Sequence, residues 1–407
     1  MSVDRLCRRA GRAAGLGILL MAPLRTAAVM ALPAPPATAA VPAASAASAT
    51  AAAPAVPVAS AASATAAAPA TAAVPAASWK ATGSIWSVPP FEFRDGFWTN
   101  LHHFLYQEAL AMGKGQASGE TRQAPNPTEP PGPRGEDERT AWSEALRFYA
   151  GSVVQHDLLF EREMIDIDYA LAGLADDASL RSPALKPELA AALVRAAPVY
   201  RARWWPAHDR ANRFWIAVAT PMVQQLGPRM IEQLAAAYHE PWPARPILVD
   251  VAVYANWAGA YTTPGDEARP GHTIVSSANP GNQGFAALET VFHEASHVFV
   301  DQANDAVTHA IEKESRARRQ EPPPKLTHAI IFYTAGELAR RNLAAVGVAD
   351  YVPSAERYGL WTRVWPTFKP ALEEFWQPYL DGKTTLDTAV ARVVASLGGA
   401  GAKAVPR

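Results

Sequence analysis

Apolar residues recur every three or four positions over most of the chain beyond residue 96. This period is typical of amphipathic α-helices, because it places the apolar side chains on one face. In residues 97–112, for example, Leu101, Phe104 and Leu105 share such a face. Further helices are predicted at residues 141–174, 187–200, 209–219, 224–238, 283–302, 305–318, 327–346, 369–380 and 386–397.

A different pattern occupies the middle of the chain. Residues 246–255 alternate between β-branched and other residues, which is typical of a β-strand. Shorter strands are predicted at residues 259–263 and 272–277, on either side of a turn at Pro264–Gly265. The predicted fold class is therefore α+β and mostly helical. Its small sheet precedes the helix of residues 283–302, and additional helices lie on the N- and C-terminal sides.

The first 78 residues show neither pattern. Residues 1–30 place basic positions ahead of an apolar run that is too short to span a bilayer, which is typical of a secretory signal peptide. The cleavage site is open up to about residue 40. Residues 31–78 are almost wholly Ala, Pro, Ser, Thr and Val, contain a tandem repeat, and predict a disordered linker. The folded domain is predicted at residues 79–407, with a disordered loop at about 113–140.

The signal peptide predicts an exported protein, periplasmic or secreted, which stays tethered if the signal is not cleaved. No stable membrane span is expected after signal removal. The balance of 37 Lys and Arg against 38 Asp and Glu lacks the basic excess of nucleic-acid-binding proteins, so no nucleic-acid partner is expected. The single cysteine, Cys7, excludes a disulfide framework and a cysteine-based zinc site. The oligomeric state is left open.

The segment His293-Glu294-Ala295-Ser296-His297 fits the pattern H-E-x-x-H on a predicted helix. Positions four apart lie on one face of a helix, so both histidines can bind one metal ion. Imidazole nitrogens suit zinc. Glu294 can take a proton from a water molecule whose pKa the ion lowers. Apolar neighbours predict that this helix is buried, where His and Glu side chains need partners.

Strands followed by an H-E-x-x-H helix resemble the zincin metallopeptidases, and the resemblance covers residues 246–341. In those families an edge strand just before the motif helix binds the substrate backbone, which implies this role for residues 272–277. The metzincin branch would have a third His at position 303, which is Ala303 here. The gluzincin branch takes a Glu from a later helix, which implies Glu337. Such a catalytic zinc has three protein ligands and one open position.

The third ligand stays open between Glu337 and His328, and the other competing ligands are His309, Glu312 and Asp301. Glu337 can instead form an ion pair with Arg340 or Arg341, and Arg341 stands where many gluzincins have a supporting Asp. His328 lies nine residues before Glu337, and this spacing places the two side chains on opposite faces of a continuous helix. Both can therefore face one metal only if the helix begins after His328. The family also implies a donor to the developing oxyanion, and His328 and Tyr333 are the candidates.

Other polar and aromatic residues allow simpler interpretations. Glu289, one turn before His293, is expected at an exposed position. His102 and His103 are adjacent on a predicted helix, so one is expected to be buried and one exposed. The tryptophans are expected in the core, with a role in a substrate cleft as the alternative. The tryptophans considered for such a cleft are Trp204, Trp205, Trp361 and Trp365.

These features predict an exported zinc-dependent hydrolase, most simply a metallopeptidase that acts on a peptide or protein substrate. Zn²⁺ would be held by His293, His297 and Glu337, with Glu294 as the general base. Two alternatives remain: a non-catalytic, zinc-stabilised exported binding protein, and a zinc amidase acting on cell-envelope material. The sequence identifies neither the cleavage specificity nor whether the enzyme is an endopeptidase or an exopeptidase.

Overall fold

The computed structural model describes residues 89–113, 122–300 and 305–401. The predicted signal peptide, the tandem-repeat linker and the predicted domain start at Trp79 lie outside the described residues. Most of the described part is helical, and one four-stranded sheet runs through it, which confirms the α+β, mostly helical prediction. Of the helices that the structure describes, none combines the length and the apolar character needed to cross a lipid bilayer.

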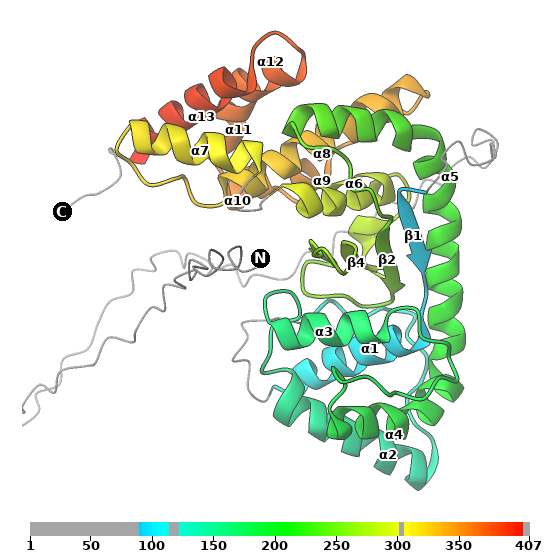
Figure 1. The fold of residues 1–407 in the computed structure, drawn as a ribbon. Helices are drawn as coiled ribbons and strands as arrows, with labels where there is room; N and C mark the ends of the chain where they lie inside the picture. The colour runs from blue at the N-terminus through cyan, green and yellow to red at the C-terminus, as the bar shows by residue number, and fades with distance from the viewer. Residues whose placement is uncertain (1–88, 114–121, 301–304, 402–407) are drawn as a thin grey trace, which may run out of the picture. The chain divides into compact units, whose positions relative to one another are not determined.

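The sheet has the order β1-β2-β4-β3, formed by β1 (Phe91–Arg94), β2 (Ile247–Ala252), β4 (His272–Ser276) and β3 (Ala260–Thr263). β1, β2 and β4 are parallel, and β3 pairs antiparallel with β4 at one edge (Figure 1). The three strands of the middle segment confirm the predicted ones. β1 was not predicted, because four residues are too few to establish an alternating pattern.

Helices cover both faces of the sheet, and each face has its own apolar core (Figure 1). Val249 and Val251 of β2 belong to one core, whereas Tyr261 and Ile274 belong to the other. Because a sheet that is covered on both faces is buried throughout, every residue of β2 is buried. The sheet therefore separates an N-terminal group of helices from a C-terminal group.

The N-terminal group consists of α1 (Phe97–Ala111), α2 (Gly135–Phe148), α3 (Arg162–Leu171) and α4 (Pro187–Arg203). The helix predicted at residues 141–174 is divided, because a π-helical turn at Tyr149–Val153 and an irregular segment separate α2 from α3. α2 also begins before residue 140, so the predicted loop of residues 113–140 ends earlier than expected. Three acidic residues in the first turn of α2 favour this start, since negative charge stabilises a helix N-terminus.

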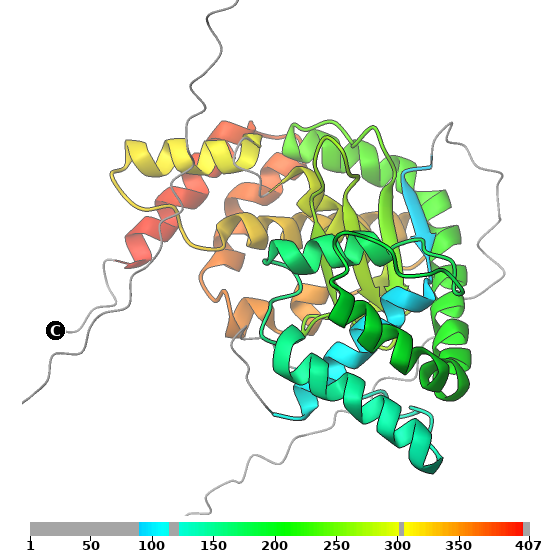
Figure 2. The same cartoon turned by 60° about the horizontal axis from the view of Figure 1, so that its bottom comes forward.

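α5 (Trp205–Tyr238) runs along the sheet from one group of helices to the other (Figures 1 and 2). Two separate helices were predicted here, at residues 209–219 and 224–238, and Pro221 lies in the gap between them. The structure corrects this prediction, since the helix continues through Pro221 and Pro228. Its buried face packs into the core beside the sheet, and such tertiary packing outweighs the loss of backbone hydrogen bonds.

The C-terminal group begins with α6 (Ala286–Phe299), α7 (Ala306–Ala317) and α8 (Leu326–Ala345), which agree with their predicted positions to within a few residues. Short helices follow, and the described part of the chain then ends in α13 (Leu386–Gly401), which packs against α7. The short helices are α9 (Ser354–Arg357), α10 (Leu360–Arg363), α11 (Phe368–Ala371) and α12 (Gln377–Leu380).

A buried polar network ties the edge strand β3 to the N-terminal helices. The hydroxyl of Tyr261 lies 2.8 Å from Nε2 of His103 on α1 and donates to Oδ2 of Asp168 on α3 at 2.7 Å. Nδ1 of His103 lies 2.9 Å from the carbonyl oxygen of Thr99, which can only accept, so this nitrogen carries a proton. Burial raises the pKa of Asp168. The three side chains thus form one hydrogen-bonded unit behind the edge strand.

This network corrects the interpretation of the two adjacent histidines. Both His102 and His103 are fully buried, because α1 is enclosed by the sheet on one side and by α2 and α4 on another. Nδ1 of His102 lies 2.9 Å from the hydroxyl of Tyr149. Neither histidine is exposed, and both contribute to the core of the N-terminal group.

Removing the central hydroxyl tests this network. Tyr261→Phe is expected to lower the free energy of unfolding by about 3 kcal/mol, because two buried polar groups lose their partner at once. Tyr358→Phe, at a partly exposed tyrosine, is the matched control and is expected to change it by less than about 0.5 kcal/mol. Urea titration followed by circular dichroism measures both values. An equal change in the free energy of unfolding for the two variants would contradict a stabilising role of the Tyr261 hydroxyl.

Candidate metal centre

Helix α6 carries the H-E-x-x-H motif between the sheet and α8, with His293 and Glu294 buried and His297 partly buried. His293 and His297 lie one turn apart on one face, with their ring centroids separated by 5.2 Å. Apolar residues on the other faces of α6, such as Leu288, Val291 and Phe292, belong to the adjoining core and hold the helix in place. The predicted juxtaposition of the two histidines is therefore present.

The third member of the group is His328, from the first turn of α8. Its ring centroid lies 5.7 Å from that of His293 and 5.1 Å from that of His297. One potential ligand atom from each histidine lies within 4.8 Å of the others, and within the described ranges this is the one group of this kind. Three imidazoles from two helices could thus hold a metal ion.

The surroundings keep the three imidazoles neutral near pH 7. Burial lowers the pKa of His293 well below its usual value, with His297 and His328 adding to the effect. Burial and His328 together lower the pKa of His297 to about 3. For His328, burial and then Lys325 lower the pKa to about 4. Nδ1 of His293 is buried without a hydrogen-bond partner among the described residues. Neutral imidazoles with an unsatisfied nitrogen fit a metal ion, because the neutral form is the one that coordinates.

Glu294 directly follows His293 on α6 and is buried, with 6% of its surface exposed. Oε2 of its carboxylate accepts a hydrogen bond of 2.8 Å from the hydroxyl of Thr262 on the edge strand β3. Burial raises the pKa of Glu294 to about 7, and the hydrogen bond from Thr262 opposes this rise. The carboxylate is therefore held between the motif helix and the edge of the sheet.

Glu337, predicted as the third ligand, does not belong to the histidine group. Its carboxylate accepts hydrogen bonds from Arg340 at 2.8 Å and from Arg341 at 2.7 Å. α8 begins at Leu326, so His328 and Glu337 belong to one continuous helix and lie half a turn out of phase. With His328 facing α6, Glu337 faces the arginines on the opposite side. Glu337 thus forms ion pairs with Arg340 and Arg341, the alternative that the sequence left open.

Tyr333 is not placed as a donor to the site either. Its hydroxyl donates to Oε1 of Gln377 on α12 at 2.8 Å, and its ring lies against Trp361. The helical spacing between His328 and Tyr333 turns the tyrosine well away from the face that carries the histidine. His328, the other candidate for this role, is a member of the histidine group. Asp301, considered as a competing ligand, lies outside the described residues.

Glu289 is buried, in contrast to the exposed position expected for it. Its carboxylate accepts hydrogen bonds from the hydroxyl of Tyr351 and the backbone N–H of Ser354. Gly336 of α8 lies directly over it, since a Cβ atom at position 336 would be 3.3 Å from Oε1 of Glu289 and 2.9 Å from Cβ of Pro353. The absence of a side chain at Gly336 therefore allows α8 to approach α6 closely.

Aromatic rings close one side of the histidine group. The ring of Phe332, one turn after His328, lies 4.1 Å from that of His293. Trp365 lies 5.7 Å from His328 and packs on Phe332. Trp365 and Trp361 are buried, as is Trp204 in the other core, which supports the core interpretation for these tryptophans. The sequence analysis missed Phe332, although its spacing from His328 places both on one helical face.

The edge of the sheet is formed by β3 and not by the segment that the resemblance implied. β4, which contains most of residues 272–277, is an internal strand with β2 on one side and β3 on the other. Strand order depends on long-range pairing, and the alternating pattern of a strand does not reveal it. Thr262 on β3 was therefore missed as the partner of Glu294.

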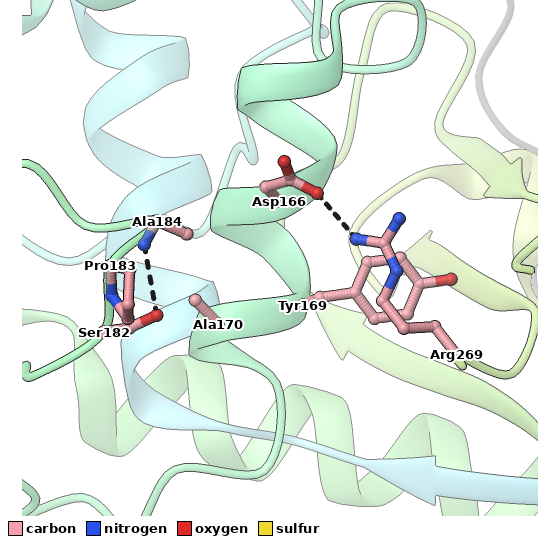
Figure 3. A pocket seen from close by; sticks show the side chains of 7 residues that line it. All are labelled: Asp166, Tyr169, Ala170, Ser182, Pro183, Ala184 and Arg269. Carbon is pink, nitrogen blue, oxygen red and sulfur yellow. Dashed lines mark hydrogen bonds and ion pairs between the residues drawn. The ribbon is translucent and has the colours of Figure 1, made fainter.

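A surface cavity of about 520 Å³ lies apart from the histidines, between α3 and the loop that joins β3 to β4 (Figure 3). Arg269 at this cavity donates to Asp166 at 2.6 Å and stacks on the ring of Tyr169. Its charge is thus already compensated by neighbouring residues. The histidine group, and not this cavity, is the arrangement of side chains that could support a reaction.

Comparisons with protein-family models, with curated proteins and with solved structures found no match to this chain. The resemblance to zincin metallopeptidases therefore stays a prediction based on His293, Glu294 and His297 in their sequence context.

Two substitutions distinguish the possible third ligands. His328→Ala is expected to weaken zinc binding at least about 100-fold, because even the loss of a residue that only supports a ligand costs about 10–100-fold. Glu337→Gln, the control on the same helix, is expected to leave zinc affinity unchanged. Competition with a fluorescent zinc chelator measures both affinities. Loss of zinc in Glu337→Gln together with its retention in His328→Ala would restore Glu337 as the ligand.

Proposed function

We propose that this chain is a zinc-dependent hydrolase, and most simply a metallopeptidase. The observation that carries the proposal is the position of the buried Glu294 directly after His293, which belongs to a group of three neutral histidines, one buried and two partly buried. Potential metal ligands and a potential general base thus occur on the same helix, and Thr262 of the edge strand donates a hydrogen bond to this base.

The donor set favours zinc. Three imidazole nitrogens are a known ligand set for catalytic zinc, and they leave a position for water or substrate. His293, His297 and His328 would hold the ion. A bound zinc ion would supply Lewis acidity, which polarises a carbonyl group and lowers the pKa of water. The wall formed by Phe332 and Trp365 would keep one side of the site dry.

Glu294 would act as the proton carrier. Its Oε2 is engaged by Thr262, so Oε1 is the oxygen that takes a proton from the attacking water. The same oxygen then gives this proton to the nitrogen of the leaving amine, and the carboxylate returns to its starting state. Burial strengthens this role, because the electrostatic interactions of a carboxylate are stronger at low dielectric than in water.

The edge strand favours an extended peptide as substrate. The backbone N–H of Ser276 donates to the carbonyl of Gly259 at 2.8 Å, so these two residues form a hydrogen-bonded pair. Pairing alternates along antiparallel strands, and the N–H and C=O groups of Ala260 and Thr262 therefore point away from β4. No described strand pairs with β3 on that side. An extended peptide can add to such an edge through its backbone.

A zinc amidase would use the same residues, and it becomes the better interpretation if cell-envelope amides are cleaved and peptides are not. A non-catalytic, zinc-stabilised binding protein is favoured by one observation, the almost complete burial of His293 and Glu294. Export remains a prediction from the N-terminal residues.

The proposal is tested with Glu294→Gln. This variant is expected to keep its zinc, because no ligand changes, and to lose at least about 100-fold in kcat, because the proton carrier is removed. Glu337→Gln is the control and is expected to keep both zinc and activity. Hydrolysis of a quenched-fluorescence peptide library and metal analysis give the two readouts. Undiminished hydrolysis by Glu294→Gln would overturn the mechanism, and zinc binding without any hydrolysis by the unaltered chain would favour the binding protein.

A further inference from the structure

We infer that Thr262 is a positioning residue for Glu294, and that Thr273 fixes the direction of its hydrogen bond. This inference rests on the proposed function of Glu294 as proton carrier. It concerns a chain of three side chains that crosses from the interior of the sheet to the motif helix. The chain runs from Thr273 on β4 through Thr262 on β3 to Glu294 on α6.

The distances connect all three groups. Oγ1 of Thr262 lies 2.8 Å from Oε2 of Glu294 and 2.8 Å from Oγ1 of Thr273. Thr262 and Thr273 are direct partners in the antiparallel register, and their pair lacks backbone hydrogen bonds, which brings the side chains close together. All three residues are buried. Water therefore does not compete for these hydrogen bonds in the way that it does at a surface.

The direction of the chain follows from counting protons. In the ionised form in which Glu294 would act as the base, its carboxylate accepts hydrogen bonds and donates none, so Thr262 donates to it. A hydroxyl has a single hydrogen, which Thr262 has then used. Thr273 must therefore be the donor to Thr262. This second hydrogen bond favours the rotamer of the Thr262 hydroxyl that points to the carboxylate.

The arrangement assigns different tasks to the two oxygens of Glu294. Among the described residues, Thr262 provides the one hydrogen bond to this carboxylate, and it is made to Oε2. Oε1 is left to exchange the proton. A Glu side chain has several rotatable bonds, so without this anchor the carboxylate can turn away from the histidines. A buried pair of threonines is common between strands, but here the pair continues to a potential catalytic group.

Thr262 also links the base to the proposed substrate. Its side chain holds Glu294, while its backbone N–H and C=O point to the free edge where an extended peptide would pair. The two functions use different atoms of one residue in a strand that the Tyr261 network fixes from the opposite face. The position of the substrate backbone and the position of the base are therefore set by the same few atoms.

The test compares variants that remove or keep the hydroxyl group in the full-length, zinc-loaded chain. Thr262→Val keeps the shape and removes the donor, and it is expected to lower kcat about 10- to 100-fold with little change in KM, since small displacements of a catalytic group have effects of this size. Thr262→Ser restores the hydroxyl and is expected to recover kcat to within about 3-fold of the unaltered chain. Thr273→Val leaves the direct donor in place and is expected to lower kcat by less than Thr262→Val does.

Thr334→Val is the matched control. Thr334 is a buried threonine on α8 whose hydroxyl accepts a hydrogen bond from Trp376 at 3.0 Å. Its loss is expected to lower thermal stability without lowering kcat. If Thr262→Val does not fold, Thr273→Val carries the test, because it disturbs the same carboxylate while the direct donor remains. An unchanged kcat in Thr262→Val, or an equal loss in Thr334→Val, would overturn the inference.

A second readout is independent of turnover. Acetohydroxamate binds zinc and can share its proton with an adjacent carboxylate, so its affinity for the zinc-loaded chain reports the placement of Glu294. Calorimetry is expected to show weaker binding for both Glu294→Gln and Thr262→Val, and restored binding for Thr262→Ser. If the unaltered chain hydrolyses nothing but these differences appear, the proposed function fails and the positioning role stands. If acetohydroxamate binds all variants equally, the positioning role fails.

Discussion

Helices α6 and α8 meet where Gly336 lies against Glu289 and Pro353, and the candidate metal centre depends on this contact. A larger side chain at position 336 would displace Pro353 or the buried carboxylate, and α8 would move away from α6. His328 would then leave the two histidines of the motif. The buried hydrogen bonds of Glu289 to Tyr351 and Ser354 hold the segment before α9 in the same place. A backbone contact two turns away from His328 thus determines whether three imidazoles can share one ion.

The sheet supplies the second half of the site, and it is fixed from both faces. Tyr261 joins β3 to α1 and α3 through His103 and Asp168, whereas Thr262, the next residue, faces α6 and Glu294. Successive side chains of a strand point to opposite faces, so one short strand can serve both purposes. The N-terminal helices contribute no residue to the histidine group, yet they determine where the edge strand lies.

The sequence was sufficient for the local features of the fold and the site. Helical and alternating patterns located most elements, and the spacing of His293 and His297 placed them on one face. Features that depend on contacts between distant segments were not predictable in this way. His328 could be chosen as the third histidine only once the start of α8 was known. His328 and Glu337 lie on opposite faces of this helix, so only one of them can face α6. The edge position of β3 and the burial of Glu289 likewise result from packing between elements.

The parallel pairing of β1 with β2 joins residues 91–94 to residues 247–250, which are far apart in the sequence. Closing so long a loop costs conformational entropy, and proteins with many distant contacts fold slowly. Helices α6 and α8, by contrast, are near neighbours in the sequence. We therefore expect the histidines to come together before the sheet is complete, so that a newly made chain would assemble its candidate metal ligands early and the hydrogen bond between Thr262 and Glu294 late. Pulsed hydrogen exchange during refolding would show this order as protection of α6 and α8 ahead of β1 and β3.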